Sequence, residues 1–398
     1  MPKTARQYDY SGSYTSYSGG LYPSGNIAHF HKRNNSIYNT PRIERQTAKR
    51  PRKKRSLAHY LVSCAAFLFM LFVIMPYGFN HVTKAIFVPT PYKNIQTDLH
   101  DVAFPMTNYL SNAWFMGQRS FRYAANEKQA QMEMLKENVN MPVLKSELEN
   151  LITLYPTIKP AVYVWDYETQ NYVDINASEV FPTASIIKIP VLIDLFKSIE
   201  AGQVSLDDKM PLTEYFRTEG SGDLQFMARN SLWNIDNLAR IMITNSDNSA
   251  TNMIMAKIGS MTDVNQAIRD WGLKNTQVNA WLPDLNGNNH TTARDLATML
   301  YNIDSNDKFL TEQSRMKMLN YMGHVHNDRL IQAGLGKDSI FLHKTGDIGS
   351  MLGDAGIVIA PNGKKYIVAI LAKRPHNSAA AKDFIVHASE IIYNYMVK

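Results

Sequence analysis

The spacing of apolar and polar positions changes along the chain, and these changes predict an order of elements. Apolar residues recur at helical spacing from Pro142 to Leu154, which predicts a helix that begins at a good first-turn residue. Residues 161–166 and 172–175 are two strand-like runs separated by the polar residues 168–171, which predicts a β-hairpin. Further along, 355–360 and 366–372 predict two strands around a Pro-Asn-Gly turn, and 384–396 predicts a last helix.

The middle of the chain, from residue 186 to about 318, has a mainly helical pattern. Strands near both ends of this region, with helices between them, indicate an α+β domain over 141–398. Its antiparallel sheet is expected to be completed by segments from the N- and C-terminal parts of the domain, with helices on its flanks.

A separate apolar pattern precedes this domain. Residues 57–75 are a run of nineteen residues without Lys, Arg, Asp or Glu, long enough to cross a bilayer. We expect one transmembrane helix within 56–79, with the basic cluster 49–55 on its cytoplasmic side and the later domain outside. A cleavable signal peptide fits less well, because the run starts far from Met1 and no A-x-A pattern follows it. Cys64, the only cysteine, lies in the run, so the outer part has no internal disulfide.

Charge is distributed unevenly. The net charge is +7, but residues 1–55 hold twelve Lys/Arg against two acidic residues, and the remainder holds 30 basic and 33 acidic residues. This excludes an electrostatic case for nucleic-acid binding by the body of the protein. Membrane lipid is the expected partner of 57–78, and anionic lipid headgroups are the expected partner of the basic cluster 49–55. Residues 1–55 are predicted to be a disordered cytoplasmic tail, and 80–140 a linker with a helical stretch at 124–138.

Candidate chemistry begins with Ser185 and Lys188. Three residues apart on a helix, they share a face, so the lysine amine is within reach of the serine hydroxyl. A lysine whose pKa is lowered can take the hydroxyl proton and make the serine a nucleophile. Alone the pair is weak, since an N-cap serine and a solvated lysine have the same spacing.

Two more motifs follow. Ser246, Asp247 and Asn248 lie among core-type residues, so these polar side chains need partners inside the fold. Lys344, Thr345 and Gly346 come just before a predicted strand, where a turn at the strand entry is the simpler interpretation of the third motif.

Together and in this order, the three motifs resemble the class A serine β-lactamases and penicillin-binding proteins, in which S-x-x-K, S-D-N and K-T-G meet at one site. EGSGDLQFM, SDNSATNMI and WLPDLNGNNHTTARDLATML also look like class A segments. The resemblance covers about Pro142 to the C-terminus and implies a β-lactamase-like fold. It implies that Ser185 is acylated, that Lys188 activates it and that Ser246 relays a proton to the leaving nitrogen. The implied binding residues are Asn248, Lys344, Thr345, Gly346, Asn286 and Asp347, whose backbone N–H joins that of Ser185 as an oxyanion hole.

One departure changes the expected kinetics. Class A β-lactamases have a Glu that orients the hydrolytic water at the position of Leu282, and leucine cannot act as a base. We therefore expect acylation of Ser185 with slow deacylation. A register shift that makes Asp284 the base stays an alternative to its expected role as a structural acid. A second departure is the absence of arginine from GDIGSMLGDAGIVIA, where many relatives bind the substrate carboxylate.

Three functions fit these features: a β-lactam hydrolase, a D-Ala-D-Ala peptidase or transpeptidase of the cell wall, and a penicillin-binding sensor. The class A-like strings favour the first, and Leu282 and the predicted anchor favour the second. Stable acylation without release would support the sensor. Neither a metal nor a cofactor is expected, because the chemistry proposed needs none.

Overall fold

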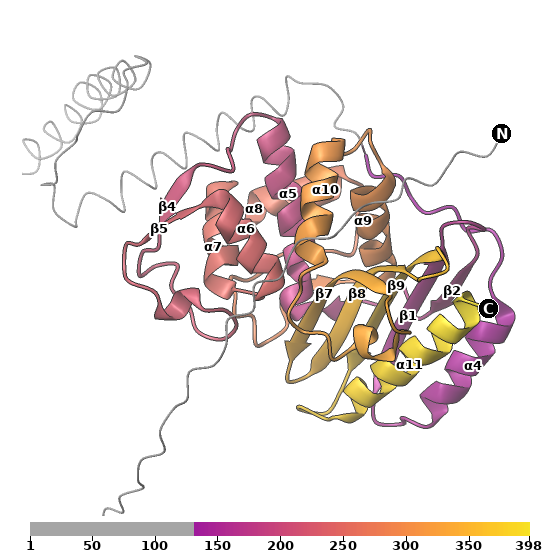
Figure 1. Cartoon of the computed structure of the whole chain (residues 1–398). Helices are drawn as coiled ribbons and strands as arrows, with labels where there is room; N and C mark the ends of the chain where they lie inside the picture. Colours follow the sequence, from indigo (N-terminus) through magenta and orange to yellow (C-terminus); the bar gives the residue numbers. More distant parts are fainter. Residues whose placement is uncertain (1–130) are drawn as a thin grey trace, which may run out of the picture. The chain divides into compact units, whose positions relative to one another are not determined.

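A five-stranded antiparallel sheet forms the centre of residues 131–398, which are the residues that the computed structural model describes (Figure 1). The strand order is β2-β1-β9-β8-β7, so β1 from the start of the domain pairs with β9 near its end. The predicted α+β architecture with such a sheet is therefore confirmed. The strands are β1 (Lys159–Asp166), β2 (Tyr172–Ile175), β7 (Ile340–Ile348), β8 (Met351–Ile359) and β9 (Lys365–Lys373).

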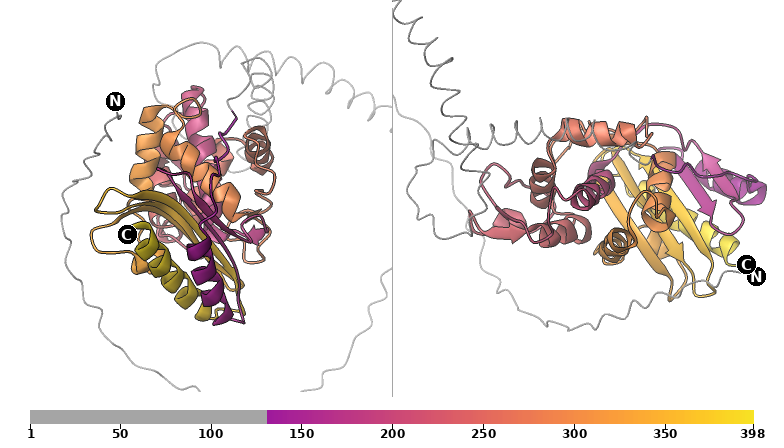
Figure 2. Two further views of the ribbon diagram at one scale, coloured as in Figure 1. Left: turned by 90° about the vertical axis from the view of Figure 1, so that its right-hand side faces the viewer. Right: turned by 90° about the horizontal axis from the view of Figure 1, so that it is seen from above.

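Both faces of the sheet are covered, and for that reason its strands are apolar at most positions. Figure 2 shows α4 (Pro142–Thr153) and α11 (Ala380–Met396) together on one face. On β1, Val162 packs toward these two helices, whereas its neighbour Tyr163 packs toward the helices on the other face. Successive side chains of a strand point to opposite faces, so one strand contributes to two cores.

The middle of the chain is mainly helical, as predicted, and forms a second lobe beside the sheet (Figure 1). Its first half contains β3 (Phe181–Pro182), η2 (Ala184–Ile187), α5 (Lys188–Glu200), β4 (Lys209–Pro211), η3 (Leu224–Phe226), β5 (Leu232–Asn234) and α6 (Ile235–Thr244). The second half contains α7 (Asn248–Lys257), α8 (Met261–Asp270), β6 (His290–Thr291), α9 (Ala293–Ser305) and α10 (Glu312–Met322). The short helix η4 (Ile331–Gly334) follows and packs against α11 on the other face of the sheet.

The predicted terminal elements of the domain are confirmed in detail. Helix α4 begins with a proline in its first turn, and Leu144 and Leu148 are buried. Val143 and Leu154, which share the apolar pattern, are instead 58% and 73% exposed. The hairpin has the predicted partners, with Trp165 opposite Tyr172.

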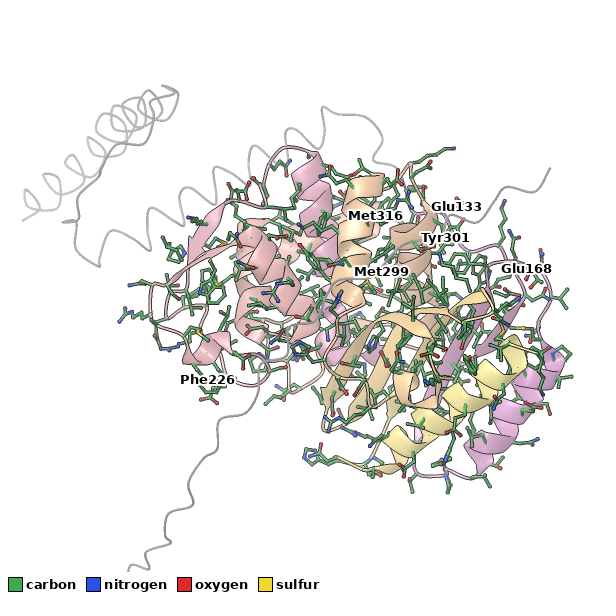
Figure 3. The ribbon with its side chains drawn as sticks, in the orientation of Figure 1. Glu133, Glu168, Phe226, Met299, Tyr301 and Met316 are labelled. Atoms are coloured by element: carbon green, nitrogen blue, oxygen red, sulfur yellow. The ribbon has the colours of Figure 1, made fainter. Side chains whose placement is uncertain are left out.

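Residues 131–141, here called the N-terminal strap, lie along the domain without forming a helix. The helix predicted over 124–138 is therefore wrong for its described part. The strap is held by backbone groups: the N–H of Met132 donates to the carbonyl of Trp271 (3.2 Å), and Trp165 Nε1 donates to the carbonyl of Lys136 (2.8 Å). Figure 3 shows Glu133 of the strap beside Tyr301 of α9. The folded domain thus includes the last residues of the predicted linker.

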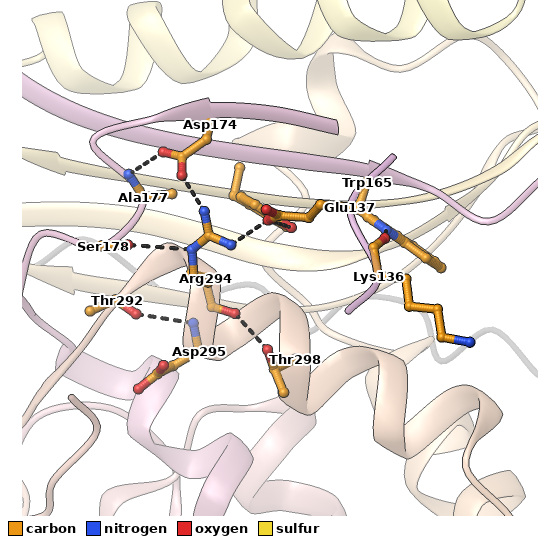
Figure 4. A network of polar contacts seen from close by, with 11 residues as sticks. Lys136, Glu137, Trp165, Asp174, Ala177, Ser178, Thr292, Arg294, Asp295 and Thr298 are labelled. Atoms are coloured by element: carbon orange, nitrogen blue, oxygen red, sulfur yellow. Dashed lines mark hydrogen bonds and ion pairs between the residues drawn. The ribbon is translucent and has the colours of Figure 1, made fainter. Parts of the chain in front are cut away.

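Arg294, at the start of α9, joins the strap to the sheet (Figure 4). Its guanidinium forms ion pairs with Glu137 of the strap and Asp174 of β2. Tyr163 Oη donates a hydrogen bond to Glu137 as well (2.6 Å). The arginine is only partly exposed, so these charged hydrogen bonds are less screened than those of a surface pair.

Replacing Glu137 by glutamine is expected to lower the free energy of unfolding by about 1 kcal/mol, because the ion pair with Arg294 is lost while the hydrogen bond to Tyr163 is kept. For a domain of this size that corresponds to a fall of roughly 2–4 °C in Tm, measured by thermal unfolding. Glu168→Gln is the matched control, because Glu168 pairs with Lys364 while 78% exposed. Equal effects of the two variants would contradict the assigned role of Glu137.

Within residues 131–398, no helix has the length and apolar character needed to cross a membrane. The predicted transmembrane helix at 56–79, the tail 1–55 and most of the linker lie outside the described residues.

Candidate active site

The first motif lies where the chain enters α5. A short 3-10 helix, η2, carries Ser185, and Lys188 is the first residue of α5. The preceding residue, Ala184, has a positive φ of 45°, a conformation that costs energy for a non-glycine residue. Lys188 Nζ lies 2.8 Å from Ser185 Oγ, and the lysine is completely buried. The predicted nucleophile and base are therefore in hydrogen-bonding contact.

The second motif meets the same lysine. Lys188 Nζ donates to the carbonyl of Ser246 (2.7 Å) and to Asn248 Oδ1 (3.0 Å), and it lies 3.1 Å from Ser246 Oγ. Ser246 adopts a positive φ of 58° between α6 and α7, which turns its hydroxyl and carbonyl to one side. Asp247 caps α7 by accepting from the backbone N–H of Ala250 (2.8 Å). The polar side chains thus have the internal partners that the sequence requires.

A glycine-rich loop covers the second motif. The carbonyl of Ser221 accepts from the backbone N–H of Asn248 (3.0 Å), and the carbonyl of Glu219 accepts from Asn248 Nδ2 (3.2 Å). Gly222 has a φ of 97°, and a Cβ there would lie 2.2 Å from Asp247 Oδ2. Glycine is therefore required for this close approach.

The third motif lies inside β7 and not before a strand, so the strand-entry turn considered for it is wrong. It belongs to an edge strand that runs beside η2. A Cβ on Gly346 would lie 2.5 Å from the carbonyl oxygen of Thr183 and 2.8 Å from Ile186 Cγ1, so the absence of a side chain lets β7 approach the nucleophile. Lys344 is fully buried, and its Nζ donates to the carbonyl of Thr345 (3.0 Å).

The site contains two buried lysines, and the charge of Lys344 affects the pKa of Lys188. Burial lowers the pKa of Lys188 well below its ordinary value, the positive charge of Lys344 lowers it further, and Asp247 opposes both effects. Burial also lowers the pKa of Lys344 to about 8, against the effect of the Asp354 carboxylate. The arrangement favours a neutral Lys188, the form that takes a proton, next to a Lys344 that remains mainly charged at neutral pH.

The acylation rate constant is expected to have a bell-shaped pH dependence. Acylation slows on the acid side where Lys188 becomes protonated. It slows on the alkaline side, near pH 8, where Lys344 loses the charge that attracts a substrate carboxylate. The measurement is the second-order rate constant for acylation by a penicillin from about pH 5 to about pH 10. A rate constant that still rises above about pH 9 would contradict the role given to Lys344.

Asp347 and two arginines lie at the end of the third motif. The Asp347 carboxylate pairs with Arg374, whose Nη2 also donates to the carbonyl of Ile348 (3.1 Å). Burial raises the pKa of Asp347, and the charges of Arg374 and Arg329 oppose that rise. Sequence reasoning missed both arginines because it considered only the string after the third motif, whereas Arg374 directly follows β9 and Arg329 lies in the loop before η4.

The loop after the second motif is anchored to α7 through Leu282. Its backbone N–H donates to Asn252 Oδ1 (3.0 Å), and its carbonyl accepts from Asn252 Nδ2 (2.7 Å). The Leu282 side chain is 5% exposed and belongs to the core. Asp284 accepts from Asn288 Nδ2 (3.0 Å) and from the backbone N–H of Asn289 (2.7 Å), so it stabilises the loop. Asn286 is exposed.

Asp284→Asn is expected to leave the deacylation rate constant unchanged within about twofold, because both Asp284 oxygens accept hydrogen bonds from its own loop. The rate constant is obtained by following loss of the acyl group by intact mass. A drop of about 10²-fold or more would instead identify Asp284 as the base. Thermal unfolding of the same variant separates a loosened loop from a lost base.

A serine in contact with a buried lysine, with a second serine on the same lysine, defines the class of serine hydrolases that form an acyl-enzyme. The family follows from the sequence: a model of the Beta-lactamase enzyme family matches residues 143–396, and the chain belongs to that family. It is a serine hydrolase of the class A β-lactamase type, as the motifs predict.

Curated relatives include β-lactamases. Beta-lactamase ROB-1 of Haemophilus influenzae is 26% identical over 255 residues, which span 60% of this chain and 79% of that protein. The extended-spectrum β-lactamase PER-1 of Pseudomonas aeruginosa is 22% identical over 288 residues, 65% of this chain and 88% of that protein.

Solved structures with the same fold include a penicillin-binding protein. PBP-A is 35% identical with a TM-score of 0.64, over 66% of this chain and 98% of that chain. A PBP-A variant with a leucine-to-glutamate substitution matches equally and was solved as an acyl-enzyme complex with penicillin G. An ancestral class A β-lactamase, 21% identical with a TM-score of 0.60 over 63% of this chain and 99% of that one, shows the shared fold.

Proposed function

We propose that this protein is a membrane-anchored serine hydrolase that is acylated by β-lactams on Ser185 and releases the product slowly. The observation that carries the proposal is Lys188, which is buried and contacts Ser185, Ser246 and Asn248 at once. The residue at the usual position of the hydrolytic base is Leu282, which is buried.

Acylation proceeds from these contacts. Ser185 Oγ attacks the lactam carbonyl carbon and gives its proton to Lys188 Nζ (2.8 Å away). The backbone N–H groups of Ser185 and Asp347 are proposed to stabilise the resulting oxyanion. When the C–N bond breaks, Ser246 Oγ–H protonates the leaving nitrogen and regains a proton from Lys188 (3.1 Å away). The product is an ester on Ser185 with an opened ring.

Substrate binding is assigned to the edge of β7 and to Asn248. The charge of Lys344, with Thr345 and Gly346, attracts the substrate carboxylate, and the Asn248 amide binds the acyl side-chain amide. Hydrolysis of the ester then needs an activated water. Because Leu282 has no group that accepts a proton, the ester is long-lived.

A second candidate is a D-Ala-D-Ala peptidase or transpeptidase of the cell wall. It uses the same acylation steps, with a peptide nitrogen as the leaving group. The specific observations that favour it are Leu282 and the 35% identity to PBP-A, which exceeds the 26% to ROB-1. The acyl-enzyme of a PBP-A variant with penicillin G supports acylation of Ser185 under either function.

The membrane part of the proposal depends on the apolar run 57–75 and the basic cluster 49–55. They support a single-pass protein with its N-terminus in the cytoplasm and the hydrolase domain outside the membrane. Resistance of the full chain to carbonate extraction, with protease digestion of the domain from the outer side, is the expected result. Digestion only after the membrane is opened would contradict this orientation.

The experiment that tests the function mixes the purified full chain with a chromogenic cephalosporin and follows absorbance and intact mass. A stoichiometric adduct with little turnover is expected, and no adduct in Ser185→Ala. Repeated rapid turnover that Ser185→Ala abolishes would establish an efficient β-lactamase and contradict slow release. Absence of any adduct in the wild-type chain would contradict the nucleophile assignment. Release of D-Ala from a D-Ala-D-Ala peptide separates the peptidase from a sensor.

A further inference from the structure

Arg374 directly follows β9 and is a buried cation beside the end of β7. Its side chain is 6% exposed, whereas the carboxylate of its ion-pair partner, Asp347, is on a side chain that is 59% exposed. A buried guanidinium is costly unless polar and charged partners surround it. The groups that Arg374 bonds therefore indicate what it holds in place.

Hydrogen bonds from two guanidinium nitrogens fix the Arg374 side chain. Its Nη2 pairs with the Asp347 carboxylate and also donates to the carbonyl of Ile348 (3.1 Å), so one nitrogen holds a side chain and the backbone of the next residue. Its Nη1 donates to the carbonyl of Ser378 (3.4 Å), which ties the guanidinium to the loop after β9. The cation is thus oriented from two separate segments of the chain.

The backbone after β9 holds the turn between β7 and β8. The N–H of Arg374 donates to the carbonyl of Ser350 (2.8 Å), and the N–H of Asn377 donates to the carbonyl of Gly349 (2.8 Å). A Cβ on Gly349 would lie 2.2 Å from His376 Nδ1, so this segment packs directly on the turn. Because β7 is an edge strand with one neighbouring strand, its end depends on these contacts for a fixed position.

The end of β7 carries the backbone N–H of Asp347, which the proposed function assigns to the oxyanion hole. On an edge strand, alternate N–H groups face away from the neighbouring strand and are free for a ligand. An oxyanion donor is effective when its direction is fixed before the reaction. The Asp347 carboxylate belongs to the same residue, and an unpaired negative charge at such short range would oppose a developing oxyanion. The contacts of Arg374 meet both requirements at once.

We propose that Arg374 is a positioning residue of the oxyanion hole, which fixes the backbone at Asp347 and Ile348 and neutralises the Asp347 carboxylate. The inference rests on the proposed function, because that function places an oxyanion next to the N–H of Asp347. The oxyanion exists in the transition state and not in the bound substrate. Arg374 therefore acts on the acylation step and not on the affinity for substrate.

The test measures acylation of the full chain by intact mass over a range of penicillin concentrations, which separates the acylation rate constant from the half-saturating concentration. Arg374→Gln removes the charge but keeps an N–H donor, and a fall of about 10- to 10²-fold in the rate constant is expected. Arg374→Lys keeps the charge without the fork of donors, and a fall of about threefold is expected. The half-saturating concentration is expected to change by less than about threefold in both variants.

Asp347→Asn in the Arg374→Gln background separates the effect of charge from that of the hydrogen bonds. Because it removes the unpaired carboxylate, the double variant is expected to acylate at least about threefold faster than Arg374→Gln. Lys364→Gln is the matched control, since Lys364 pairs with the buried Asp166 next to the opposite end of β9. It is expected to lower Tm while the acylation rate constant stays within about twofold of the wild-type value.

A wild-type rate constant in a folded Arg374→Gln chain would overturn the proposal, and so would a double variant that is no faster than Arg374→Gln. A change confined to the half-saturating concentration would instead make Arg374 a ligand of the substrate. If Arg374→Gln fails to fold, Arg374→Lys decides, and a wild-type rate constant in that variant contradicts the proposal. Failure of the proposed function itself is distinguishable, because the wild-type chain would then form no adduct.

Discussion

Lys188→Met is expected to slow acylation of Ser185 by roughly 10²- to 10⁴-fold, the range that a general base contributes. Methionine has nearly the same length as lysine and fills the fully buried site, but it cannot accept the Ser185 proton. It also ends the relay to Ser246, so opening of the lactam loses its proton supply. The measurement is the rate of adduct formation by intact mass at several penicillin concentrations.

Lys197→Met is the matched control for this prediction. Lys197 lies on the same helix, α5, but its Nζ donates to the carbonyl of Phe309 (2.8 Å), away from the motifs. It is expected to acylate at nearly the wild-type rate. Because Lys188→Met leaves Asn248 Oδ1 and the Ser246 carbonyl without a donor, thermal unfolding must accompany the kinetics. Wild-type acylation by a folded Lys188→Met chain would require another base.

The apolar pattern predicts individual strands of the sheet better than it predicts their order. Strands buried on both faces are recognisable as short apolar runs, so the hairpin at β1 and β2 and the strands β8 and β9 were predictable. The sequence predicted that segments from both ends of the domain would complete one sheet. It did not predict that β1 pairs with β9. The pattern does not predict the order that leaves β7 at the edge, because β7 is buried at most of its positions, as the central strand β8 is.

Some contacts of the candidate site could likewise be predicted from the sequence, and others could not. Ser185 and Lys188 are fixed by helical spacing, and the contacts of Lys188 with Ser246 and Asn248 agree with the motif resemblance. Spacing could not place Arg374 beside Asp347, because that contact depends on where β9 ends relative to β7. The resemblance covers about Pro142 to the C-terminus, but it gives no role to His343 and Asp354, which lie 2.8 Å apart on β7 and β8. Their contact arises from strand register, which a sequence pattern does not give.

The N-terminal strap shows that local sequence does not always predict secondary structure. A polar stretch before the domain has a helical composition, yet residues 131–139 are not helical because the domain offers them backbone partners. Hydrogen bonds to Trp271, Asn302 and Trp165 replace those that a helix would supply. Tertiary contacts of this kind override local propensity.

Leu282→Glu is expected to accelerate deacylation by about 10²-fold, the lower part of the range for a general base. The backbone at this position is already fixed by Asn252, so the new carboxylate starts from a defined place next to the second motif. The low end applies because leucine is 5% exposed in an apolar core, where a carboxyl is partly held in its neutral form. The gain should therefore increase as the pH rises and the carboxyl ionises.

Leu285→Glu is the matched control, since Leu285 is in the same loop and 74% exposed. It adds the same charge without a position near the acylated serine, and no acceleration is expected. If Leu282→Glu deacylates no faster than this control while remaining folded, release is limited by something other than the missing base, such as exclusion of water from the ester. If it deacylates faster while acylation stays the same, the chain already has a complete acylation machinery, and one apolar side chain separates a long-lived acyl-enzyme from turnover.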